Sequence, residues 1–180
     1  MQLNYTEQGD GHAVILMHGM FGSLSNLGNL ARYLADHYRV ISVDLRNHGD
    51  SPHDPTMDIP SMANDVVDLM DKLGLPDARL VGHSLGGKIA MQVALNHPDR
   101  VAKLVVADIS PVAYNPRQDA ALDALLELSS ATILNRAEAD ALMAKYVPEH
   151  STRAFLLKNL GRNVEAVSYT HLTLPTMVQV

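Results

Sequence analysis

Several features that define other classes of protein are missing from this chain of 180 residues. It has no cysteine, which excludes disulfides and thiolate metal sites. Its 14 Lys and Arg against 20 Asp and Glu give a formal net charge of −6 without a basic stripe, so nucleic acid is not an expected partner. No apolar run approaches membrane-spanning length, and the N-terminus has no basic segment followed by an apolar one. We therefore expect a cytoplasmic protein that does not bind membranes.

The first two thirds of the chain alternate short apolar runs with helical patterns. Strands are predicted around 3–7 and at 13–17, 40–43, 80–81 and 104–107. Helical periodicity fills the intervals over 27–34, from Pro60 to Gly74, and from the residue after Ser84 to Pro98. Strands that are buried on both faces and separated by helices indicate an α/β fold with a doubly wound, mostly parallel sheet.

A change of composition after Asp108 predicts a second region. Pro111 and Pro116 bracket a linker, and alanine- and leucine-rich helical segments follow over 119–128, 136–145 and 151–160. We divide the chain into the N-terminal sheet region 1–117, a helical cap segment 118–166 and a tail 167–180. A cap over an active site and an ordinary helical subdomain without a role in substrate binding fit this pattern equally well.

The motif Gly82-His83-Ser84-Leu85-Gly86-Gly87 lies between a predicted strand and a predicted helix. Glycines on both sides of Ser84 allow the backbone to turn sharply and expose the serine oxygen. The helix that follows directs free N–H groups and the positive end of its dipole at the same place. Such a site activates serine as a nucleophile for acyl transfer, and a mere glycine-rich turn is the alternative interpretation.

Further motifs occur in a fixed order around this one. Through HGMFGSLSNLGNLARYL, VDLRNHGDSPHDP, GHSLGGKIAM and VVADISPVAY, the chain resembles the α/β-hydrolase superfamily and, within it, the YbfF-type bacterial esterases. The resemblance covers about residues 1 to 165. It implies an α/β-hydrolase fold with a helical cap, and hydrolysis of small-molecule carboxylic esters or thioesters by a Ser-His-Asp triad. It also implies that no cofactor is needed.

The resemblance assigns roles to individual residues. Ser84 is the nucleophile, and the backbone N–H of Leu85 is one donor of the oxyanion hole. The loop after the first central strand supplies the other donor, with Met20 as the first choice and Phe21 as the second. Asp108 is the expected triad acid, because it ends the strand after Ser84 and catalytic groups gather at that edge of a parallel sheet. Its alternative role is to cap the linker turn.

Other polar residues of these motifs are interpreted as structural. His18 lies at a strand end, where a satisfied structural histidine is expected rather than a catalytic base. Asp44 and Arg46 are expected to fix their loop through hydrogen bonds and ion pairs. His48 and His53 of the same loop lack metal-site spacing and a third ligand, so no metal is expected.

The C-terminal end departs from the family pattern. In this fold the triad histidine follows the acid, after the last strand. Beyond Asp108 the sequence contains only His150 and His171, and His150 is expected at a helix start or in solvent. Residues 167–176 resemble the conceptual translation of a transposase-type sequencing adapter, so the native sequence is expected to end near Ala166.

Two functions follow from this departure. The general-base histidine is expected to be absent from the chain, and the strand at 104–107 is expected to become an exposed edge of the sheet. The parent gene would then encode a serine esterase or thioesterase that acts through an acyl-enzyme on Ser84. The alternative is a catalytically inactive, truncated fragment that at most binds small acyl ligands.

Overall fold

The computed structural model describes residues 1–112, 120–131, 133, 135–161 and 171–172. These residues belong to two compact units, one before and one after the stretch 113–119. The predicted boundary between residues 117 and 118 lies outside the described residues, as does most of the predicted tail. Within the described part of the chain, no helix is long and apolar enough to cross a bilayer.

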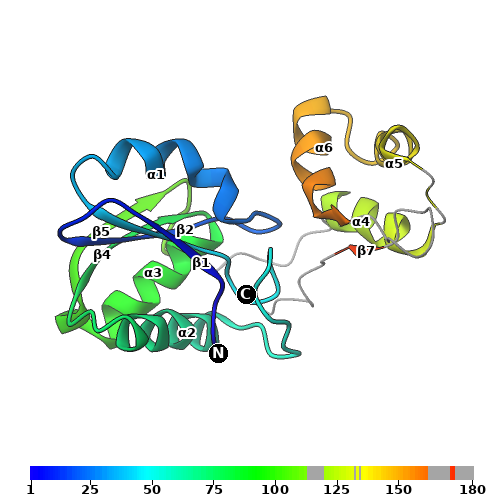
Figure 1. Cartoon of the computed structure of the whole chain (residues 1–180). Helices are drawn as coiled ribbons and strands as arrows, with labels where there is room; N and C mark the ends of the chain where they lie inside the picture. The colour runs from blue at the N-terminus through cyan, green and yellow to red at the C-terminus, as the bar shows by residue number, and fades with distance from the viewer. Residues whose placement is uncertain (113–119, 132, 134, 162–170, 173–180) are drawn as a thin grey trace. The chain divides into compact units, whose positions relative to one another are not determined.

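The first unit is built on a sheet with helices on both faces (Figure 1). Among the described residues its five strands follow the order β1-β3-β2-β4-β5. They are β1 (Tyr5–Gln8), β2 (Ala13–Met17), β3 (Arg39–Val43), β4 (Ala78–His83) and β5 (Val101–Ala107). Neighbouring strands pair in parallel, except that β1 runs antiparallel to β3. The predicted doubly wound, mostly parallel α/β sheet is confirmed.

Helix α1 covers one face of this sheet, and α2 and α3 cover the other (Figure 1). The helical elements of the unit are η1 (Leu24–Leu27), α1 (Gly28–Leu34), α2 (Ile59–Lys72), α3 (Leu85–Asn96) and η2 (Pro98–Arg100). Helix α2 begins where the carboxylate of Asp58 accepts a hydrogen bond from the Ser61 N–H at 2.7 Å, with Pro60 in the first turn. It ends before Gly74, whose φ of 65° is a conformation that favours glycine.

Strand β2 lies at the centre of the core, and all five of its residues are buried. Ile15 and Met17 pack in the cluster formed with α2 and α3, whereas Val14 and Leu16 pack in the cluster formed with α1. Helices cover both faces of this strand, so its sequence is an apolar run without polar alternation.

The second unit is helical. It contains α4 (Ala120–Ser130), α5 (Arg136–Met143), α6 (His150–Leu156), η3 (Leu157–Asn159) and the short antiparallel pair β6 (Leu160–Gly161) and β7 (His171–Leu172). Buried Arg153 links its parts, because Nε donates to Asp140 Oδ1 at 2.8 Å and Nη1 to the carbonyl oxygen of Pro148 at 2.7 Å. The predicted helices are present, and His150 is the first residue of α6, as expected.

Candidate active site

The carboxyl ends of β2 and β4 meet at the centre of the sheet, where the direction of strand addition reverses. From β2 the chain continues to β3 on one side, whereas β4 and β5 lie on the other side. Open parallel sheets bind their ligands at such a point. Two segments leave the sheet here. One is the loop of residues 18–22 after β2, and the other is the turn at Ser84 after β4.

Ser84 occupies a strained turn between β4 and α3. Its φ of 50° and ψ of −114° lie in a region that residues other than glycine rarely adopt. The Ser84 N–H donates to the carbonyl oxygen of Ala107 in β5 at 2.9 Å, and the Ser84 carbonyl oxygen accepts from the Gly87 N–H at 2.9 Å. The predicted sharp turn is confirmed. The residue is half-buried.

Two glycines permit this turn, because a side chain at either position would clash with the neighbouring backbone. A Cβ at Gly82 would lie 2.2 Å from the carbonyl oxygen of Gly86, and a Cβ at Gly86 would lie 2.4 Å from the carbonyl oxygen of Met17. Both distances are far inside van der Waals contact. The Gly86 N–H also donates to the carbonyl oxygen of His18 at 3.1 Å, which joins the first turn of α3 to the end of β2.

The 18–22 loop lies directly against the serine. A Cβ at Gly19 would lie only 3.2 Å from the Cβ of Ser84. The loop is closed by the Gly22 N–H, which donates to the Gly19 carbonyl oxygen at 3.1 Å. Within the described residues, the N–H groups of Met20 and Leu85 have no hydrogen-bond partner. Two unengaged backbone N–H donors close to a serine are the groups that an oxyanion hole requires.

Phe21, the second choice for an oxyanion donor, has its N–H engaged elsewhere. That N–H donates to Nε2 of His48 at 3.2 Å, and Phe21 adopts a φ of 60°. The contact favours Met20 over Phe21 as the partner of Leu85.

His18 is buried beneath the same loop, with an exposed fraction of 1%. Its Nδ1 lies 2.8 Å from the Gly19 carbonyl oxygen, and its Nε2 accepts the Leu45 N–H at 3.1 Å. A carbonyl accepts and an amide donates, so the ring is neutral with its proton on Nδ1. Burial lowers the pKa of His18 and keeps it neutral. Both ring nitrogens are occupied, in agreement with the structural role expected from the sequence.

His48 has a similar pair of ring contacts and is equally buried. Its Nδ1 lies 2.8 Å from the carbonyl oxygen of Arg46, and its Nε2 accepts from Phe21 as described above. Its ring packs edge-on against the ring of His18, with centroids 5.1 Å apart. Burial, followed by repulsion from His18, lowers the pKa of His48 to about 4.

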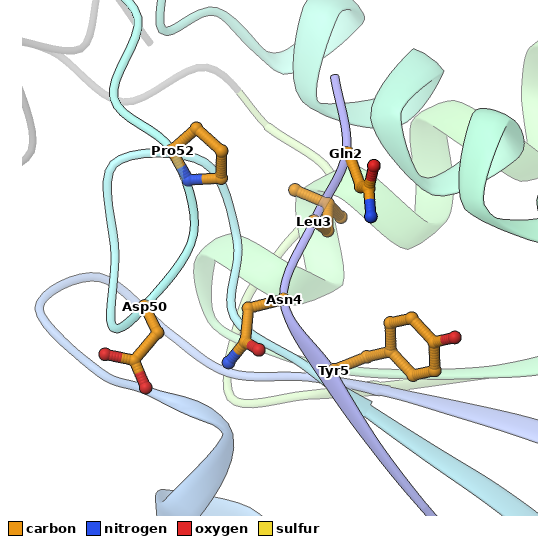
Figure 2. A pocket seen from close by; sticks show the side chains of 6 residues that line it. All are labelled: Gln2, Leu3, Asn4, Tyr5, Asp50 and Pro52. Carbon is orange, nitrogen blue, oxygen red and sulfur yellow. The ribbon is translucent and has the colours of Figure 1, made fainter.

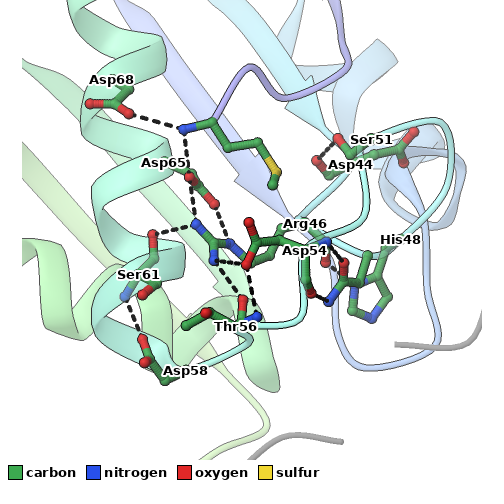
Figure 3. Close-up of polar contacts among 12 residues, drawn as sticks. Asp44, Arg46, His48, Ser51, Asp54, Thr56, Asp58, Ser61, Asp65 and Asp68 are labelled. Atoms are coloured by element: carbon green, nitrogen blue, oxygen red, sulfur yellow. Dashed lines mark hydrogen bonds and ion pairs between the residues drawn. The ribbon is translucent and has the colours of Figure 1, made fainter. Parts of the chain in front are cut away.

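The loop that carries His48, residues 44–54, is fixed by buried ionic contacts (Figure 3). Arg46 forms a two-point ion pair with Asp65 of α2, with Nε–Oδ2 and Nη2–Oδ1 distances of 2.6 and 2.9 Å. Nη1 of Arg46 also donates to the Thr56 carbonyl oxygen at 2.6 Å. The Asp44 carboxylate accepts the Leu24 N–H at 2.7 Å. The loop-fixing roles expected for Asp44 and Arg46 are confirmed.

Asp108 follows β5 at the same edge of the sheet as Ser84. It comes directly after Ala107, whose carbonyl oxygen accepts the Ser84 N–H. The Asp108 side chain is 88% exposed, and Oδ2 lies 3.6 Å from Nε2 of His83. A Cβ at Gly19 would lie 3.0 Å from Nδ1 of the same imidazole. Sequence reasoning did not single out His83, although its position directly before Ser84 was a signal that it borders the site.

A shallow depression of about 400 Å³ lies elsewhere on the first unit (Figure 2). It is lined by Gln2, Leu3, Asn4, Tyr5, Asp50 and Pro52. None of these residues belongs to the 18–22 loop or to the turn at Ser84, so this depression is not where an acyl group would meet the serine.

Known proteins with similar sequences and structures agree with this geometry. Residues 12–146 match the family described as alpha/beta hydrolase fold. Esterase YbfF of Escherichia coli is 44% identical over 147 residues, which cover 81% of this chain and 58% of that protein. The sn-1-specific diacylglycerol lipase ABHD11 of Mus musculus is 43% identical over 157 residues, covering 82% of this chain and 51% of that lipase.

A solved structure agrees as well. A marine microorganism esterase superposes with a TM-score of 0.87 at 32% identity and covers 96% of this chain and 68% of that one. The chain spans between about half and three fifths of the length of the two curated relatives. On the sheet order, the strained serine turn and these matches, the chain belongs to the α/β-hydrolase family, where it is similar to YbfF-type esterases.

Proposed function

We propose that the chain carries the nucleophile, the acid and the oxyanion hole of a serine hydrolase for small-molecule carboxylic esters or thioesters. The observation that carries this proposal is the strained turn of Ser84, at the point where the strand order reverses and against the 18–22 loop. The esterase and lipase relatives support ester hydrolysis as the class of reaction. Asp108 is the proposed acid, because its backbone continues from the strand residue that pairs with Ser84.

The reaction begins when Oγ of Ser84 attacks the carbonyl carbon of the ester and gives its proton to a base. The carbonyl oxygen gains the negative charge and is stabilised by the N–H groups of Leu85 and Met20, each such donor being worth about 100- to 1,000-fold in turnover. Collapse of the tetrahedral intermediate expels the alcohol or thiol, which takes the proton from the base. Water then gives a proton to the base and attacks the acyl carbonyl carbon. The bond from the acyl group to Oγ breaks, the base returns the proton to Ser84, and the carboxylic acid is released.

The base is the component that these surroundings of Ser84 do not supply. His18 and His48 have both ring nitrogens engaged, and within the described residues no hydrogen bond joins the Ser84 hydroxyl to the imidazole of His83. We propose that the triad base is a histidine from the part of an α/β hydrolase that lies beyond the region matched here, positioned by Asp108. The 180-residue chain alone is then a poor catalyst that retains the nucleophile turn.

The test compares two proteins in the hydrolysis of p-nitrophenyl acetate. One is the 180-residue chain, and the other is a chimera in which the part of esterase YbfF that follows the matched region continues this chain. We expect Ser84-dependent turnover in the chimera and near-background rates in the chain, because loss of one triad member costs about four to six orders of magnitude. Equal, Ser84-dependent activity in both would place the base within the chain.

The controls separate chemistry from folding. Ser84→Ala in the chimera should abolish turnover, whereas Ser129→Ala should leave it unchanged. Ser129 is an exposed residue of α4, and among the described residues its hydroxyl donates only to the nearby Leu126 carbonyl oxygen. Turnover in the chimera that persists after Ser84→Ala would show that Ser84 is not the nucleophile.

A further inference from the structure

We propose that His48 is a positioning residue that holds the 18–22 loop in the geometry of an oxyanion hole. It does so by accepting the Phe21 N–H on Nε2, and thereby fixes the peptide group next to the Met20 donor. This inference rests on the proposed function, since it concerns how the donors beside Ser84 are kept in place.

Two successive peptide groups of the loop are each held by one histidine. The Gly19 carbonyl oxygen contacts Nδ1 of His18 at 2.8 Å and accepts the Gly22 N–H at 3.1 Å. A trans peptide is planar with its C=O and N–H antiparallel, so the Met20 N–H points away from His18. The next peptide group is held through its N–H, which His48 accepts at 3.2 Å. Met20 therefore lies between two clamped peptide groups.

The clamp is needed because this loop is strained. Phe21 adopts a φ of 60°, which is uncommon for an aromatic residue and is kept only where other contacts impose it. If the side chain of residue 48 offered no acceptor to the Phe21 N–H, the half-buried loop would lose the hydrogen bond that Nε2 of His48 now forms. The peptide group could then rotate and carry the Met20 N–H away from the oxyanion position.

The acceptor depends on the tautomer of His48, and the 44–54 loop sets that tautomer. The Arg46 carbonyl oxygen, 2.8 Å away, requires a proton on Nδ1 and leaves Nε2 free to accept. Arg46 itself is tied to buried Asp65. The charged or titratable groups that act on the His48 ring are His18, Asp44 and His53. Their balance with burial keeps the ring neutral at neutral pH, so it serves as an acceptor there.

A matched pair of amide variants separates this role from simple packing. His48→Gln can place its Oε1 near the position of Nε2, whereas His48→Asn places its amide near the position of Nδ1 and falls short of Phe21. His53→Asn, a change at an exposed histidine of the same loop, serves as the control.

The first experiment uses the 180-residue chain and NMR, so it does not depend on activity. In the wild type, long-range ¹H–¹⁵N spectra should show His48 protonated on Nδ1 and unprotonated on Nε2. Hydrogen exchange of the Phe21 amide should accelerate about tenfold or more in His48→Asn, the value of one lost hydrogen bond, and stay near wild type in His48→Gln and His53→Asn. A proton on Nε2, or equal protection in every variant, would overturn the proposal. The tautomer measurement decides even if His48→Asn does not fold.

The second experiment uses the chimera described above. His48→Asn should lower kcat about tenfold or more with little change in KM, because an oxyanion donor acts mainly in the transition state. His48→Gln should restore most of kcat. A change in KM with kcat unaltered, or a kcat in His48→Gln as low as in His48→Asn, would contradict a positioning role. An inactive chimera would instead count against the proposed function and leave the NMR result to judge His48.

Discussion

Strands β2 and β5 have similarly apolar sequences but very different surroundings. Every residue of β2 is buried, whereas Leu104 and Val105 of β5 are 40% and 52% exposed. Strand β2 has neighbours on both sides and helices on both faces, while β5 lies at the end of the strand order, paired only with β4 among the described residues. The apolar run alone thus does not determine burial, because burial also requires neighbours that cover the strand.

The residues of the candidate site also lie in these two different surroundings. The turn at Ser84 and the 18–22 loop belong to the covered centre, where glycine contacts and buried histidines hold them. Asp108 follows the uncovered strand, and its side chain is 88% exposed. We therefore expect substitutions at the centre to have larger effects than substitutions at the β5 edge.

The largest effect is expected where a buried charge loses its two-point partner. Arg46→Met leaves Asp65, which is only 2% exposed, with the N-terminal ammonium group of Met1 at 2.9 Å as a remaining ionic partner. Removing one partner of a buried pair costs about 3 to 5 kcal/mol where the other charge is left uncompensated, so we expect a loss of about 3 kcal/mol in the free energy of unfolding, measured by urea denaturation. Arg39→Met, which breaks the outer ion pair with Glu7, should cost at most about 1 kcal/mol. Similar losses of unfolding free energy in both variants would show that the buried Arg46–Asp65 pair stabilises the fold no more than the outer Arg39–Glu7 pair does.

The strand comparison can be tested with alanine substitutions. Ile15→Ala in β2 should cost about 2 to 5 kcal/mol of unfolding free energy, because it leaves a cavity at a fully buried position. Val105→Ala in β5 should cost less than about 1 kcal/mol, since its side chain is already 52% exposed. If thermal or urea unfolding gave a large loss for Val105→Ala, the β5 edge would have to be covered in solution.

Stability should fall in mild acid because of the buried histidines. The pKa of His48 is about 4 in the folded chain, below the ordinary value of 6.5, so the unfolded chain binds more protons between these values. The contribution of neutral, buried His48 to the free energy of unfolding is complete above about pH 6.5 and is lost as the pH falls toward 4. His18, whose pKa is also lowered, acts in the same direction.

Urea unfolding between pH 7.5 and 5 should therefore show a loss of about 2 kcal/mol from His48 alone. In His48→Gln this pH dependence should shrink by about that amount, and in His53→Asn it should change little, because repulsion from His53 is the weakest of the influences that lower the pKa of His48. A profile identical in wild type and His48→Gln would show that His48 does not titrate as a buried group.

The smallest effect on stability is expected at the uncovered edge. Val105→Lys places a charge at an exposed apolar position of β5. Edge strands of native proteins commonly carry such charged side chains, which prevent association through the edge. Unfolding free energy should change by about 0.5 kcal/mol or less. If copies of the chain associate through this edge, light scattering should show weaker association for Val105→Lys than for the wild type. Unchanged association would mean that the β5 edge is not where copies of the chain meet.

The features predictable from sequence are those encoded over a few residues. The run Ala13 to Met17 predicted a buried strand with the observed bounds, and the glycine-flanked Ser84 predicted its turn. Strand β4 is longer than the apolar pair Leu80 and Val81 that predicted it, because pairing with β2 and β5 continues beyond the apolar residues.

The contacts that sequence reasoning missed join separate loops. The Phe21 N–H and His48 are 27 residues apart, and only the folded sheet brings their loops together. The approach of His83 to Asp108 likewise depends on the pairing of β4 with β5. No local pattern encodes these contacts, so the sequence could rank Met20 before Phe21 as the predicted oxyanion donor but could not show that the Phe21 N–H is engaged by His48.

The most direct test of the central claim is the acylation of Ser84 itself. The chimera is mixed with p-nitrophenyl acetate, quenched in acid within the first turnover, and analysed by intact-mass and peptide mass spectrometry. We predict one acetyl group, located on Ser84 and absent from Ser84→Ala. An active chimera that carries no acetyl group, or an acetyl group on another residue that persists in Ser84→Ala, would contradict the account.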